Sequence, residues 1–263
     1  MIAAAEGHNV AIADVAGAFL KADMEDFVLM KLEGTTVDIM CELDPSLEDF
    51  VCIENGKRVL YMQLIKALYG CVQSALLWYK LFSTTLFDMG FKLNLYDLCV
   101  ANATIDGKQC TSVWYIDDNM ITHMDPAVIT SIIEKIEDKF RKMTVTRKKS
   151  HEFLGMGLHF DKDNTTGVSM KEYIKVAIAD FPEDIIRNAA TPAAKHLFDV
   201  SDKDEDEPLC LTQAAKFHWI VAKLLYVCKQ PMQTSSLLLL SCVPEFRARP
   251  STIGESSNAS CNT

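Results

Sequence analysis

The sequence predicts an α+β fold, in which an antiparallel sheet of the ferredoxin-like type has helices on one face. Candidate elements follow the order strand–helix–strand–strand–helix–strand, which is the order of that sheet. The dipeptides Asn55-Gly56 and Asp106-Gly107 each separate two strand candidates, and such dipeptides favour tight turns between antiparallel strands. With 49% hydrophobic residues, the chain of 263 residues can form a buried core.

The first half of the chain predicts strands, one loop and one helix. Residues 9–15 form an apolar run that predicts a buried strand, and residues 27–32 predict a second strand. Residues 33–49 contain Gly, Pro and many acids and predict a loop, whereas residues 51–53 and 59–64 predict a hairpin. A helix is expected from its cap, Ser74, to its end at Gly90. Its apolar residues fall on one stripe, namely Trp78, Phe82, Leu86 and Met89.

The second half begins with strands at 97–105 and 110–116 and a further strand that runs to His123. Asp125 as cap and Pro126 in the first turn predict a helix over 126–142, with isoleucines at helical spacing. Residues 152–160 predict a strand, and residues 171–180 and 213–228 predict helices. Ser, Pro and Asn dominate after residue 241, which is typical of a disordered tail.

Acidic residues mark the ends of two predicted strands. Asp117 and Asp118 lie in Tyr115-Ile116-Asp117-Asp118, between two apolar runs, and Asp14 ends the run Val10-Ala11-Ile12-Ala13. Carboxylate oxygens are the ligands that Mg²⁺ prefers, and two such ions catalyse phosphoryl transfer in polymerases. Paired acids are also common in ordinary turns, so the neighbouring motifs must decide between the two interpretations.

Four motifs together resemble the reverse transcriptase of copia-type retrotransposons, over about residues 8–228. They are Asp14-Val15-Ala16-Gly17-Ala18-Phe19-Leu20, Lys66-Ala67-Leu68-Tyr69-Gly70-Cys71-Val72-Gln73-Ser74-Ala75, Tyr115-Ile116-Asp117-Asp118 and His151-Glu152-Phe153-Leu154-Gly155-Met156. The resemblance implies a palm with partial fingers over residues 1–160 and a helical thumb-like or connection-like segment over 161–228. Similarity ends soon after residue 228, so residues 229–263 are expected to be a disordered or frameshifted tail. The resemblance also implies truncation at both ends, because the family's triphosphate-gripping Lys and Arg lie upstream.

The resemblance implies a set of catalytic and substrate-binding residues. Asp14, Asp117 and Asp118 would be the catalytic residues and the ligands of two Mg²⁺ ions, for which Mn²⁺ can substitute. The substrate-binding residues would be Val15, Phe19, Gln73 and Tyr115. The aromatic ring of Phe19, five positions after Asp14, would exclude a 2′-hydroxyl by steric contact. The backbone amides of residues 15–18 would be candidate donors to the triphosphate. For Phe19, Gln73 and Tyr115, the alternative is an ordinary structural position in the core, at a helix start or at a strand end.

Nucleic-acid contacts are expected from a basic run and from the Phe-Leu-Gly motif. The basic residues are Lys139, Arg141, Lys142, Arg147, Lys148 and Lys149, and the motif is Phe153, Leu154 and Gly155. The net charge of −10 argues against a uniformly basic surface, but the acids collect in residues 42–49 and 199–207. A solvated charged face is the alternative.

The resemblance implies an RNA-directed DNA polymerase, a nucleotidyltransferase that binds an RNA or DNA template–primer and dNTP. Integrase and ribonuclease H of a Pol polyprotein would be further partners, and the location would be a cytoplasmic retroelement particle. No membrane segment is expected. Two alternatives remain open: an inactive remnant that only binds nucleic acid, and a metal-dependent phosphoesterase.

The sequence departs from the family pattern at one place in the second motif. In the family, Pro-Arg is common where Ala75-Leu76 stands.

Overall fold

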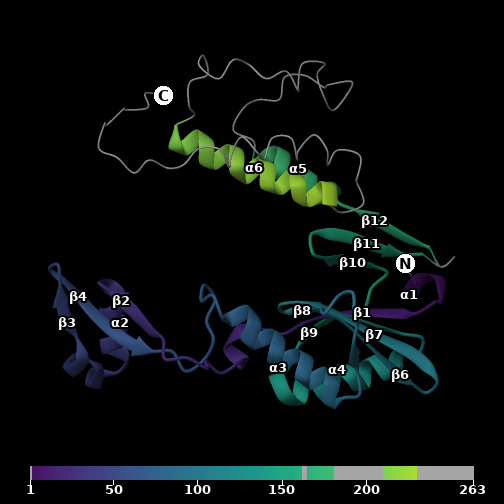
Figure 1. Ribbon diagram of the computed structural model, residues 1–263, viewed down its shortest axis with the longest axis horizontal. Coiled ribbons are helices and arrows are strands. Elements are labelled where there is room, and N and C mark those ends of the chain that lie inside the picture. Colours follow the sequence, from purple (N-terminus) through teal and green to yellow (C-terminus); the bar gives the residue numbers. More distant parts are fainter. Residues whose placement is uncertain (1, 162–164, 181–209, 230–263) are drawn as a thin grey trace. The chain divides into compact units, whose positions relative to one another are not determined.

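The computed structural model describes residues 2–161, 165–180 and 210–229, which belong to two compact units, residues 1–167 and 168–263 (Figure 1). Each unit is described by itself. The predicted disordered or frameshifted tail lies outside the described residues, apart from residue 229.

The first unit is built around a six-stranded antiparallel sheet with the order β5-β6-β7-β8-β1-β9. Its strands are β1 (Asn9–Asp14), β5 (Lys92–Leu93), β6 (Val100–Ile105), β7 (Lys108–Tyr115), β8 (Asp118–His123) and β9 (Thr144–Thr146). The predicted antiparallel α+β arrangement is confirmed. The strand β9 was not predicted, because its three residues carry no strand pattern of their own. It pairs with β1, which therefore lies between β8 and β9.

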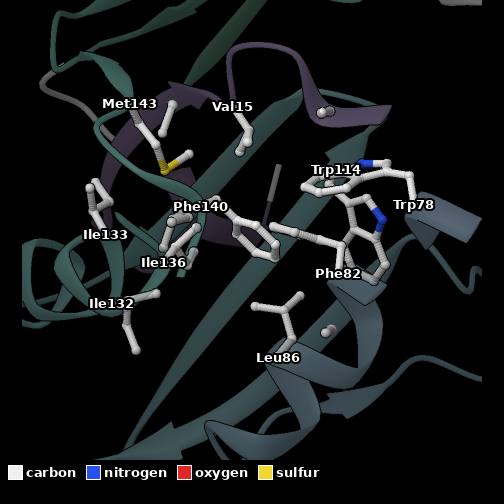
Figure 2. Packing of buried hydrophobic residues seen from close by; sticks show 14 of the residues in the cluster. Val15, Trp78, Phe82, Leu86, Trp114, Ile132, Ile133, Ile136, Phe140 and Met143 are labelled. Carbon is white, nitrogen blue, oxygen red and sulfur yellow. The ribbon is translucent and has the colours of Figure 1, made fainter. Parts of the chain in front are cut away.

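Two helices, α3 (Ser74–Asp88) and α4 (Pro126–Phe140), pack on this sheet and form the main core with it. Figure 2 shows how Phe140 of α4 approaches the aromatic residues of α3 and β7. The Trp78 ring lies 5.1 Å from the Phe140 ring and 5.3 Å from the Phe82 ring, centroid to centroid. Asp125 caps α4 as predicted, since its carboxylate accepts a 2.8 Å hydrogen bond from the Ala127 amide.

The predicted cap of α3 is wrong by one residue. Gln73 is the N-cap and Ser74 is the first helical residue. The Ser74 hydroxyl instead donates a 2.6 Å hydrogen bond to the Leu68 carbonyl, so it fixes the preceding turn rather than the helix end.

A second sheet has the order β2-β4-β3, formed by β2 (Leu29–Glu33), β4 (Lys57–Gln63) and β3 (Cys52–Glu54). Asn55 and Gly56 connect β3 and β4 with φ of 48° and 75°, as the predicted hairpin requires. The predicted loop over 33–49 is wrong, because α2 (Thr35–Leu43) and the 3₁₀ helix η2 (Pro45–Phe50) occupy most of it. Burial of Val37 and the Asp44 cap of η2 outweigh the acidic composition.

The predicted strand over 152–160 is a hairpin of β10 (Ser150–Phe153) and β11 (Met156–Phe160), to which β12 (Thr166–Ser169) adds a third strand. Leu154 and Gly155 form its turn with φ of 53° and 67°. Glycine adopts this conformation without strain, which explains why the apolar run folds back here. Two short elements complete the first unit, α1 (Ile2–Ala5) and the 3₁₀ helix η1 (Ala18–Lys21).

The second unit contains α5 (Lys171–Ala179) and α6 (Leu211–Lys229), close to the two predicted helices. The Tyr173 and Tyr226 rings pack at 5.2 Å, and Lys223 forms an ion pair with Asp180. A thumb-like or connection-like role for this segment stays a prediction. In the described part of the chain, no helix has the length and apolar character needed to cross a membrane.

Candidate active site

Two of the predicted catalytic carboxylates lie directly opposite each other on neighbouring strands. Asp14 is the last residue of β1, Asp118 is the first residue of β8, and the two are partners in the antiparallel register. The Val15 amide then donates a 3.0 Å hydrogen bond to the Asp117 carbonyl, which closes this end of the ladder. The sheet therefore brings together residues that are about 100 positions apart in the sequence.

The turn that presents Asp117 has a strained backbone. Tyr115 and Asp118 are paired, so Ile116 and Asp117 form a two-residue turn. Ile116 has φ of 53°, which is unfavourable for a β-branched side chain. The indole Nε1 of Trp78 donates a 2.6 Å hydrogen bond to the Ile116 carbonyl. The helix α3 thus holds the turn in this conformation.

The carboxylates repel one another in their ionised forms. Burial and, second, the charge of Asp117 raise the pKa of Asp14 above its ordinary value. Burial raises the pKa of Asp118 in the same way, followed by the charges of Asp117 and Asp14. A divalent cation bound here would relieve this repulsion.

The donor atoms fit a hard cation, since carboxylate oxygens are the ligands of Mg²⁺. They do not form a closed site as they stand. Among the residues that the structure describes, no group of three or more His, Cys, Asp or Glu side chains is arranged to hold a metal ion. Asp14, Asp117 and Asp118 therefore have donor atoms that suit a hard cation, but they form no preformed three-ligand cage in the described residues.

Val15, which follows Asp14, is packed within the protein. Its side chain is buried, and its N–H is engaged by the Asp117 carbonyl. Substrate binding by Val15 stays a prediction. In this structure its amide couples the end of β1 to the Asp117 turn.

Phe19 lies in η1 and is almost completely buried. Its ring packs on Tyr69 at 4.4 Å between centroids. Burial and, second, the charges of Asp117 and Asp14 raise the pKa of Tyr69, so this phenol lies in the field of the carboxylates. Tyr69 was not among the predicted site residues. Its presence in the same motif as Gln73, next to a turn glycine, was the signal that could have identified it.

Gln73 and Tyr115 have different environments. The Gln73 side-chain amide donates a hydrogen bond to the carboxylate of Asp26, which lies in the segment before β2. Tyr115, at the end of β7 opposite Asp118, is 55% exposed. Of the two, Tyr115 is placed for contact with a ligand beside the carboxylates.

The strand β9 divides the predicted basic run into two groups. Lys139, Arg141 and Lys142 lie at the end of α4, where Lys139 also complements the helix dipole. Arg147, Lys148 and Lys149 follow β9, whose pairing of Thr144 with Asp14 and Thr146 with Ile12 directs the chain away from the carboxylates. In the described part of the chain, none of the six forms an ion pair.

The Phe-Leu-Gly motif forms the end of the β10–β11 hairpin. Phe153 is buried and contributes to packing, whereas Leu154 and Gly155 make the turn. Of this motif, the turn backbone is the part that a nucleic acid could approach.

Comparison with known proteins assigns the chain to a family. The family described as reverse transcriptase (RNA-dependent DNA polymerase) matches residues 1–195. The chain belongs to this reverse transcriptase family, which confirms the resemblance seen in the four motifs. It is also similar to the putative transposon Ty5-1 protein of Saccharomyces cerevisiae, at 24% identity over 222 residues and 81% of this chain. The chain spans 62% of the length of that relative.

Proposed function

We propose that this chain is the RNA-directed DNA polymerase domain of a copia-like retrotransposon and transfers a nucleotide from dNTP to a primer 3′-hydroxyl. The observation that supports the proposal most directly is the pairing of Asp14 with Asp118, beside the Asp117 turn. Membership of the reverse transcriptase family supports the interpretation of these paired carboxylates as catalytic. The relative from a transposon favours a retroelement as the source.

Asp14, Asp117 and Asp118 would hold two Mg²⁺ ions, or Mn²⁺ in their place. When bound, such ions activate the 3′-hydroxyl and neutralise the charge of the leaving pyrophosphate. The protein's own contribution is to fix the carboxylates by the β1–β8 register and to hold the turn through Trp78. Positioning of this kind accounts for most of phosphoryl-transfer catalysis.

The surrounding residues would position the substrates. Tyr115 is exposed next to Asp118 and would contact the primer end. Phe19, supported by Tyr69, would lie under the incoming sugar. The unpaired basic residues and the Leu154-Gly155 turn would contact the template–primer backbone. In a full Pol polyprotein, integrase and ribonuclease H would be joined to this domain, in a cytoplasmic particle.

Primer extension tests the proposal. The purified chain is given an RNA template, an annealed DNA primer, dNTPs and either Mg²⁺ or Mn²⁺, beside the double variant Asp117→Asn/Asp118→Asn. We expect extension by the wild type and none by the variant. No extension by a folded wild-type chain that still binds template–primer would instead support the inactive nucleic-acid-binding remnant. Hydrolysis of a phosphodiester without extension would support the phosphoesterase.

Phe19→Val is expected to weaken discrimination against ribonucleotides. A smaller side chain leaves room for a 2′-hydroxyl, and a contact of this kind changes selectivity by about 10–100-fold. The measurement is the ratio of kcat/KM for a dNTP and the matching rNTP. Phe27→Val is the matched control, because Phe27 is 72% exposed and is not part of η1. Equal ratios for the wild type and Phe19→Val would remove Phe19 from the sugar site.

A further inference from the structure

A cavity of about 440 Å³ lies in the first unit, among the start of β1, the start of α4 and the segment after β9. Its walls are about equally polar and apolar, and some of the apolar wall residues are fully buried. The apolar wall residues are Ala4, Val10, Ala11, Pro126, Ile129 and Phe160. Cavities of roughly 300–1,000 Å³ with apolar walls and a few polar groups are typical of small-molecule sites.

The polar part of the lining is mainly cationic. Arg147, Lys148 and Lys149 line the cavity with exposed side chains, and the described residues provide no ion-pair partner for them. The one carboxylate in the lining, Asp161, is paired with His159 at 3.0 Å. Three positive charges against one negative charge leave an excess of two in a chain whose net charge is −10. Unpaired cations beside apolar wall residues favour a ligand with an anionic end and an apolar body.

The cavity is separate from the carboxylate site. His8 and Asn9 line it, whereas Asp14 ends the same strand. Ala11, the lining residue of β1 nearest to Asp14, precedes it by three strand steps, which correspond to roughly 10 Å. Arg147 directly follows Thr146, the last residue of β9, which pairs with Ile12. A ligand in this cavity therefore does not occupy the position between Asp14 and Asp118.

We propose that this cavity binds one nucleotide unit, with its phosphate against Arg147, Lys148 and Lys149 and its base against the apolar walls. Arginine and lysine bind phosphate through charge-assisted hydrogen bonds, and Phe160 supplies an aromatic face against which a base can stack. A free nucleotide and the end of a single strand share this chemistry. Only the second half of the basic run would take part, because Lys139, Arg141 and Lys142 do not line the cavity.

The test measures binding by fluorescence anisotropy, using a fluorescent deoxynucleotide and, separately, a labelled single-stranded oligonucleotide. The protein carries Asp117→Asn/Asp118→Asn and is kept in EDTA, so that the carboxylate site does not contribute. In this background Arg147→Ala/Lys148→Ala/Lys149→Ala is compared with Lys139→Ala/Arg141→Ala/Lys142→Ala, which removes the same charge elsewhere. A third variant, Val10→Trp, adds bulk to the cavity lining and keeps all six cations. If Val10→Trp does not fold, Phe160→Ala is used as the cavity variant, because it removes the proposed stacking ring and also keeps the six cations.

We expect the 147–149 variant and the cavity variant each to bind about tenfold more weakly, and the 139–142 variant to bind within about twofold of the parent. Equal losses for the two triple variants would overturn the proposal in favour of diffuse surface attraction. Parent-like affinity of the cavity variant would also overturn the proposal. So would the absence of binding of either probe by the parent protein. Binding of the mononucleotide identifies a free nucleotide, and binding of the oligonucleotide alone identifies a strand. Because the protein used cannot perform nucleotide transfer, the result is independent of primer extension.

Discussion

Asp14→Asn is expected to lower the rate of nucleotide addition by about 100–1,000-fold, because removing one preorganised electrostatic group from an active site has effects of this size. The same variant should raise the Tm of the metal-free protein at neutral pH. The pKa of Asp14 is raised in the folded state, so the ionised carboxylate opposes folding. Asparagine keeps the shape of the side chain and removes that charge.

The pH dependence has a defined sign. A carboxyl group whose pKa is higher in the folded protein binds its proton more tightly there, so its contribution to stability falls as pH rises from 3.8 to the raised pKa. Thermal unfolding of the wild type and Asp14→Asn from pH 3 to 8 should therefore converge at low pH and diverge above it. Asp138→Asn, on the exposed side of α4, is the control. A lower Tm for Asp14→Asn at pH 7 would contradict the repulsion, and full activity would remove Asp14 from the site.

Trp78→Ala is expected to cost about 3–5 kcal/mol of unfolding free energy, as for other large-to-small substitutions in a core. The Trp78 side chain is 2% exposed and contacts Phe82 and Phe140. Its loss also removes the hydrogen bond to the Ile116 carbonyl, which holds the strained turn. We therefore expect the substitution to reduce both stability and primer extension.

Trp78→Phe separates these two effects. It keeps most of the packing and removes the indole N–H, so we expect a smaller stability loss, about 1–3 kcal/mol, with a disproportionate loss of extension. Chemical denaturation and extension rates measured below the unfolding transition provide the two quantities. Tyr96→Ala is the exposed aromatic control. If extension by Trp78→Phe fell only in proportion to its unfolded fraction, the turn would not depend on the indole.

The sequence predicted the parts of the fold whose pattern is local. The apolar period of α3 and α4, the Asn55-Gly56 turn and the strand ending at Asp14 all depend on neighbouring residues, and all are present. The region 33–49 was misjudged because its acidic and turn-forming residues masked the buried Val37 of α2. The short strand β9 was missed because its stability comes from pairing with β1 rather than from its own three residues.

In the candidate site too, some features were predictable from the sequence and others were not. Asp14 and Asp118 were predicted to lie together, and the β1–β8 register confirms that they do. Three features depend on groups that the fold brings together from distant segments: the contact between Tyr69 and Phe19, the backbone hydrogen bond from Val15 to Asp117, and the basic cavity. No local pattern encodes such contacts.

The central place of β1 in its sheet has a consequence for the order in which the protein folds. Both partners of β1 come late in the chain, since Asp14 pairs with Asp118 and with Thr144. At about 5–20 residues per second, synthesis of this separation takes on the order of 5–25 s, during which the apolar strand has no partner. Closing so long a loop is slow. During that interval the strand exposes two unpaired backbone edges, so nascent chains of this protein should depend on chaperones until β9 has been made.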